Sequence, residues 1–127
     1  MIFDASSVYK AIETGIIEKL ANEKTLDLSL YELGNVVWKN VSRKNLSSEE
    51  GIELVNFLSE VLSLMDILTI GTKSDVLEMA IKNNLSYYDA SYLYASISFT
   101  DILVSEDKKL LGAASKCGIE SYSIENI

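Results

Sequence analysis

The chain has 127 residues, 48% of them hydrophobic, which is enough for one core, so we expect a single domain over residues 1–127. It has no histidine and one cysteine, which excludes an internal disulfide, a Cys- or His-based zinc site and a Ser-His-Asp triad. The net charge of −8 argues against broad, non-specific nucleic-acid binding. The sequence shows neither a membrane-spanning run nor a secretory signal, so we expect a cytoplasmic protein without membrane contact.

Short apolar runs alternate with longer segments of helical periodicity along the chain. We expect strands at residues 1–3, 25–28, 67–70, 102–105 and 121–124. We expect helices at residues 6–22, 30–43, 47–64, 72–83, 86–99 and 106–117. This alternation predicts an α/β fold with a central parallel sheet covered by helices on both faces.

The expected helix at 47–64 is apolar on more than one side. One stripe consists of Leu54, Val55, Leu58, Val61 and Leu62. Three further apolar residues, Ile52, Phe57 and Leu64, lie off this stripe, as Trp38 does in the preceding helix. Two interpretations remain open: a well-buried helix, or a surface for an oligomer or partner.

Four acidic residues lie where sites form in parallel α/β sheets, beyond the carboxyl ends of strands. Asp4 follows the first strand, Glu32 lies one turn into the helix after the second, and Asp107 follows the apolar run at 102–104. Asp89, at the start of a helix, is a fourth candidate. Carboxylates are suited to a hard divalent cation, and such chemistry needs no histidine.

Helix capping explains the same four residues without any site. Two of them lie three residues after a serine, Ser29 or Ser86, as in a capping box. The other two stand where an acidic side chain favours a helix N-terminus. Capping and metal binding can coexist at one helix start, so the pattern alone leaves both open.

Four segments resemble the signature stretches of PIN-domain proteins, in the order typical of that family. They are residues 2–7 (IFDASS), 29–32 (SLYE), 88–95 (YDASYLYA) and 103–110 (LVSEDKKL). In particular, the chain resembles the VapC-type toxins of bacterial and archaeal toxin–antitoxin pairs. The resemblance covers nearly the whole chain, and the four segments together are more specific than any one.

This resemblance implies a PIN-like three-layer α/β/α sandwich with a central parallel sheet, and endonucleolytic cleavage of RNA with Mg²⁺ or Mn²⁺. The family's acidic quartet falls on Asp4, Glu32, Asp89 and Asp107. Ser6 and Ser105 would orient the carboxylates, or a water on the ion, without being ligands themselves. The resemblance also implies an antitoxin that covers the site, and a homodimer. The number of metal ions and the RNA target stay open.

Positive charge for an RNA substrate could come from Lys39 and Arg43, which recur with Glu32 along one side of a helix. Ordinary solvated charge explains the same pattern. Tyr88 and Tyr92 could stack on an unpaired base, although helix aromatics more often pack in the core.

Other functions fit parts of the pattern. A PIN-domain nuclease of RNA processing would have no antitoxin. A non-catalytic interaction module would use the carboxylates only as helix caps. A phosphoacceptor receiver domain is remote, because such domains carry paired acids after the first strand, whereas Asp4 is followed by Ala5, Ser6 and Ser7.

Overall fold

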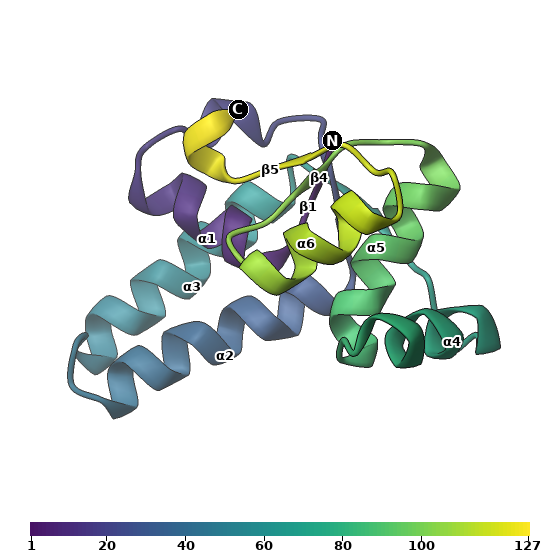
Figure 1. The fold of residues 1–127 in the computed structure, drawn as a ribbon. Coiled ribbons are helices and arrows are strands. Elements are labelled where there is room, and N and C mark those ends of the chain that lie inside the picture. The colour runs from purple at the N-terminus through teal and green to yellow at the C-terminus, as the bar shows by residue number, and fades with distance from the viewer.

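The computed structural model covers residues 1–127 and contains five short strands and six α-helices (Figure 1). The strands are β1 (Ile2–Phe3), β2 (Lys24–Leu26), β3 (Asp66–Leu68), β4 (Leu103–Val104) and β5 (Ser121–Tyr122). The α-helices are α1 (Ala5–Glu13), α2 (Leu28–Ser42), α3 (Ser48–Leu62), α4 (Ser74–Asn83), α5 (Tyr87–Phe99) and α6 (Lys108–Lys116). Two 3₁₀ turns, η1 (Ile17–Lys19) and η2 (Ile124–Asn126), complete the chain. None of the helices combines the length and apolar character needed to cross a lipid bilayer.

All strand pairs are parallel, and the strand order is β3-β2-β1-β4-β5. The central strand β1 pairs on one side with β2 and on the other with β4, so the order reverses at β1. In open parallel sheets, the crevice beyond the carboxyl ends at such a reversal is where ligands bind. The predicted parallel sheet is confirmed.

Alternate residues of each central strand face opposite sides of the sheet. Phe3 and Val104 pack in a core with α1, α2 and α3, whereas Ile2 and Leu103 pack with α5 and α6. Figure 1 shows α2 and α3 lying side by side on one flank of the molecule and α4 beside α5 on the other. The predicted α/β/α sandwich is therefore confirmed.

The expected first helix at 6–22 is wrong at its C-terminal end. The helix stops at Glu13, and Gly15 adopts a left-handed conformation with φ of +74°, which is accessible to glycine at little cost. A separate 3₁₀ turn then returns the chain so that Leu20 is fully buried. The other five helices begin and end within two residues of the predicted bounds.

The apolar surplus seen in the sequence lies on the surface. Trp38 and Ile52 are 63% and 64% exposed, so a fully buried helix is the wrong interpretation there. Leu30 and Ile81 are also exposed. Exposed apolar residues grouped on neighbouring helices are typical of interaction surfaces.

The two glycines of the α6 region should respond oppositely to alanine. Gly112 lies inside α6 with open space around its Cα, so Gly112→Ala should raise stability by about 0.5–1 kcal/mol. Gly118 has φ of +73° after the helix, so Gly118→Ala should cost roughly 1 kcal/mol. Urea unfolding of both variants checks this prediction, and a shift of the same sign in both would contradict it.

Candidate active site

The structure brings all four acidic residues around one pocket of about 290 Å³. Asp4 comes from the end of β1, Glu32 from α2, Asp89 from the first turn of α5 and Asp107 from the N-cap of α6. Lys39 of α2 also lines the pocket. The pocket therefore gathers side chains from four separate stretches at the carboxyl ends of β1, β2 and β4.

Asp4 is held most tightly, with only 5% of its surface exposed. Its Oδ1 accepts hydrogen bonds from the Ser6 hydroxyl at 2.7 Å and from the Ser7 backbone N–H at 2.9 Å. Its Oδ2 accepts one from the Ser105 hydroxyl at 2.5 Å. Burial raises the pKa of this carboxyl, and the three hydrogen bonds oppose that rise.

The two serines expected behind the carboxylates join the first strand to the loop after β4. Ser105 Oγ, which donates to Asp4, also accepts from the Asp107 backbone N–H at 2.9 Å. Ser6 Oγ donates to Asp4 and accepts from the Glu106 N–H at 3.0 Å. The backbones carrying Asp4 and Asp107 are therefore fixed relative to each other.

Glu32 is held from the opposite helix layer. Its Oε1 accepts a hydrogen bond from the phenol of Tyr92 at 2.9 Å. The same phenol contacts Ser29 Oγ at 2.5 Å, and Ser29 Oγ contacts Thr25 Oγ1 at 2.6 Å. Thr25 donates to the Phe3 carbonyl at 2.7 Å. Sequence reasoning missed this role for Thr25 and Ser29, and only their position within an apolar stretch could have indicated it.

The helix-cap interpretation holds for two of the four carboxylates. Asp4 caps α1, and Asp107 caps α6 by accepting from two backbone N–H groups. Asp89 donates its backbone N–H to Ser86, without the reciprocal bond of a complete box. The box expected at Ser29 is wrong, because α2 already begins at Leu28 and Ser29 is buried. Capping and pocket lining thus coexist.

The pocket concentrates negative charge away from water. Burial first, and then the charges of Asp4 and Asp89, raise the pKa of Glu32, while the Tyr92 hydrogen bond opposes the rise. Burial, followed by the charges of Asp107 and Asp4, raises the pKa of Asp89. A bound cation would relieve this mutual repulsion.

The donor set suits Mg²⁺ or Mn²⁺, because it consists of carboxylate oxygens alone. As the side chains stand, no group of three or more His, Cys, Asp or Glu residues is arranged to hold an ion. Magnesium is usually bound through one or two carboxylates, with water and substrate phosphate completing its shell. A pocket of four spaced carboxylates fits that kind of binding better than a closed protein cage.

The raised pKa values predict how stability changes with pH. A carboxyl whose pKa is raised by folding stabilises below its unfolded pKa, near 4, and this contribution is lost as pH rises through the folded value. Without divalent cations, the melting temperature should therefore fall as the pH is raised from 4 to 7. At pH 7, added Mn²⁺ should recover part of the lost melting temperature.

Glu32→Gln serves as the control for this pH dependence, since it removes one such carboxyl and retains an acceptor for Tyr92. Its melting temperature should fall less steeply with pH than that of the wild type. A wild-type curve that matches the Glu32→Gln curve, and that Mn²⁺ leaves unchanged, would contradict the prediction.

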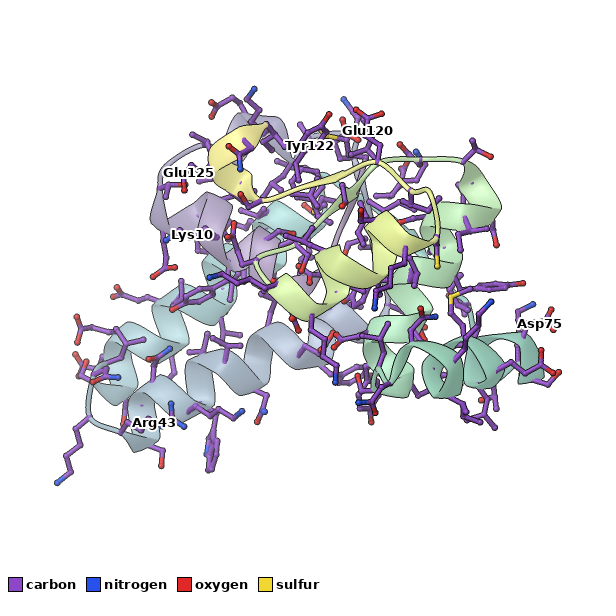
Figure 2. The ribbon with its side chains drawn as sticks, viewed as in Figure 1. Lys10, Arg43, Asp75, Glu120, Tyr122 and Glu125 are labelled. Atoms are coloured by element: carbon purple, nitrogen blue, oxygen red, sulfur yellow. The ribbon has the colours of Figure 1, made fainter.

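The basic residues differ in their distance from the acidic pocket. Lys39 lines the acidic pocket and Lys10 an adjoining cavity, whereas Arg43 ends α2 far from the pocket (Figure 2). Tyr92 packs in the core with 1% exposure, and Tyr88 is 62% exposed. Stacking on a base therefore remains open only for Tyr88.

A parallel α/β/α sandwich with carboxylates gathered at the strand-order reversal defines a PIN-like domain, and comparison with known proteins leads to the same class. The chain is 36% identical over 94 residues to Exonuclease VapC9 of Pyrobaculum aerophilum and 30% identical over 90 residues to Ribonuclease VapC3 of the same organism. These alignments cover 74% and 68% of this chain and 66% of each relative, just under two thirds. No family model matches the chain.

Among solved structures, the crystal structure of PAE2754 from Pyrobaculum aerophilum superposes with a TM-score of 0.81 and 28% identity. It matches 98% of this chain and 89% of its own. The chain belongs to the VapC-type family of PIN-domain proteins.

Proposed function

We propose that this protein is a metal-dependent ribonuclease that hydrolyses phosphodiester bonds in RNA as the toxin of a toxin–antitoxin pair. The observation that carries the proposal is the gathering of four carboxylates in one pocket, where their repulsion and burial favour a cation. The names of two relatives, an exonuclease and a ribonuclease, support nuclease chemistry.

The residues divide into distinct roles. Asp4, Asp89 and Asp107 would hold the ion, and Glu32 would hold it or orient the attacking water. A divalent ion supplies positive charge to the scissile phosphate and makes water more acidic. Ser105 keeps the Asp4 carboxylate in one orientation, so that little reorganisation is needed during reaction.

Cleavage of a defined RNA with Mg²⁺ or Mn²⁺, and its loss with a chelator, tests the proposal. A closed circular RNA as second substrate separates the modes of cleavage, because an exonuclease needs an end. Cutting of the circle supports the endonucleolytic mode that we propose for this chain. Equal RNA turnover with and without metal, or none in either condition, would contradict the proposed function.

Lys39 lines the pocket, and we expect it to contact a phosphate of the substrate. Lys39→Ala should weaken RNA binding severalfold and reduce the slope of log K against log salt by about 0.7 for one lost contact. Lys116→Ala, at the opposite end of α6 from the pocket, is the control and should leave both unchanged. Arg43→Ala should have a smaller effect than Lys39→Ala. Equal effects of all three variants would show that RNA binding depends on the net charge of the protein and not on a contact made by Lys39.

A protein partner is also part of the proposal. The groove between α2 and α3, about 420 Å³, is lined mainly by apolar side chains, with Trp38 and Ile52 exposed beside it. Such a surface suits an antitoxin segment or a second copy of the chain.

Two observations test the partners. Sedimentation should show a dimer, and a monomer at high concentration would count against a homodimer. A neighbouring gene for a small DNA-binding protein would favour the toxin over an RNA-processing nuclease.

A non-catalytic interaction module is the second candidate, favoured by the capping bonds and by the lack of a preformed three-ligand set. Titration with Mn²⁺ separates the two. Thermal stabilisation by Mn²⁺ favours the nuclease, and its absence favours the module.

A further inference from the structure

Tyr92 reaches across the core from α5 to α2 and ends against Glu32. Its ring is buried in the apolar cluster with Ile2 and Leu103, and its hydroxyl is the polar tip of that cluster. The phenol donates to Glu32 Oε1 at 2.9 Å, and Oε2 accepts no hydrogen bond within the chain. One carboxylate oxygen is therefore occupied by the protein and the other is free.

The phenol is the last of three buried hydroxyls in a row. Thr25, Ser29 and Tyr92 make four contacts in sequence, from the Phe3 carbonyl at one end to the Glu32 carboxylate at the other. The three hydroxyls carry three protons, and both ends of the row can only accept when Glu32 is ionised. One of the four contacts must then lack a proton.

The contact to the ionised carboxylate is the one that is retained, because charge-assisted hydrogen bonds are about twice as strong as neutral ones. The Tyr92 proton is then committed to Glu32. Thr25 donates its proton to the Phe3 carbonyl, so Ser29 can donate to Tyr92 or to Thr25. The contact that lacks a proton is therefore one of the two that Ser29 makes, with Thr25 or with Tyr92.

We propose that Tyr92 is a positioning residue that fixes Glu32, holding Oε1 so that Oε2 faces the ion or the attacking water. This inference rests on the proposed function, since it assigns a purpose to one carboxylate of that site. Ser29 supports the phenol from behind. A tyrosine serving only to fill the core would need its ring but not its hydroxyl, so removing the hydroxyl alone distinguishes the two roles.

Tyr92→Phe keeps the ring and removes the donor. Calorimetric titration should show Mn²⁺ affinity reduced about 10-fold or more, in the range found when partners of metal ligands are removed. Cleavage should lose turnover by a similar factor, with the KM for RNA nearly unchanged. Tyr94→Phe is the matched control, because Tyr94 lies on the same helix, is partly buried and makes no side-chain hydrogen bond. Ser29→Ala should give a smaller loss than Tyr92→Phe.

A double variant separates positioning from packing. With Glu32→Ala already present, Tyr92→Phe should lower Mn²⁺ affinity no further, because the group that it positions is gone. The same fold-loss in both backgrounds would overturn the inference. Wild-type affinity in Tyr92→Phe, together with weakened affinity in Asp89→Asn, would overturn the role of Tyr92 and leave the proposed function standing. A wild-type protein that neither binds Mn²⁺ nor cleaves RNA would overturn both.

Discussion

Asp89→Asn is expected to reduce RNA cleavage by more than about 100-fold while making the metal-free protein slightly more stable. Loss of a residue that we propose to bind the ion directly should exceed the 10- to 100-fold cost of removing a ligand's partner. Stability should rise because the carboxylate is desolvated and repelled by Asp107 and Asp4, which together raise its pKa. Since Asp89 is only half-buried, the gain is of the order of 0.5 kcal/mol.

Asp75→Asn is the matched control for this prediction. Asp75 also lies in the first turn of a helix, α4, but it is exposed at the outer flank of the molecule (Figure 2). Both substitutions lose the interaction of an acidic side chain with a helix N-terminus. Asp75→Asn should therefore leave cleavage intact and lower stability marginally. Cleavage by Asp89→Asn at the wild-type rate would remove Asp89 from the site.

Asp4→Ala is expected to abolish cleavage and, in contrast to Asp89→Asn, to lower the free energy of unfolding by roughly 2–3 kcal/mol. Asp4 receives hydrogen bonds from Ser6, Ser7 and Ser105, and alanine would leave the buried donors of Ser7 and Ser105 unsatisfied. It would also remove the cap of α1. The relief of a desolvated charge offsets only part of this loss.

Urea unfolding of Asp4→Ala, Asp4→Asn and Asp107→Ala tests the assignment. Asp4→Asn keeps one acceptor oxygen and should fall between the wild type and Asp4→Ala. Asp107→Ala loses a half-exposed cap and should cost only about 1 kcal/mol. A stability of Asp4→Ala equal to that of the wild type would show that the hydroxyl network contributes nothing.

Asp89→Asn and Asp4→Ala change the same pocket but should have opposite effects on stability. The difference comes from the hydrogen bonds that each carboxylate makes. Asp4 is built into the scaffold, with donors on both of its oxygens. Asp89 contributes charge to the pocket with fewer protein contacts. A site of this kind combines a fixed carboxylate with others whose mutual repulsion a bound cation would relieve.

The alternation of apolar runs and helical segments was sufficient to predict the parallel sheet and its two helical layers. Periodicity is a local property, and five of the six helices therefore lie close to their predicted bounds. Asp4 and Asp107 were also recognisable, because each follows a buried strand and parallel strands end at one edge of the sheet.

The resemblance implied that Ser6 and Ser105 support the carboxylates, whereas only the tertiary structure showed the row of Thr25, Ser29 and Tyr92 behind Glu32. The link between Ser29 and Tyr92 joins positions 63 residues apart, and that between Asp4 and Ser105 spans 101. No local pattern encodes such contacts, since they depend on how strands and helices pack. The same holds for the exposure of Trp38 and Ile52, which depends on the faces of α2 and α3 that other elements cover. By itself, the sequence determined the layers and the acidic residues at their edge, because both follow from local periodicity and strand ends. Packing decided which carboxylate oxygens accept hydrogen bonds and which stay free, because such bonds form between segments that are far apart in the sequence.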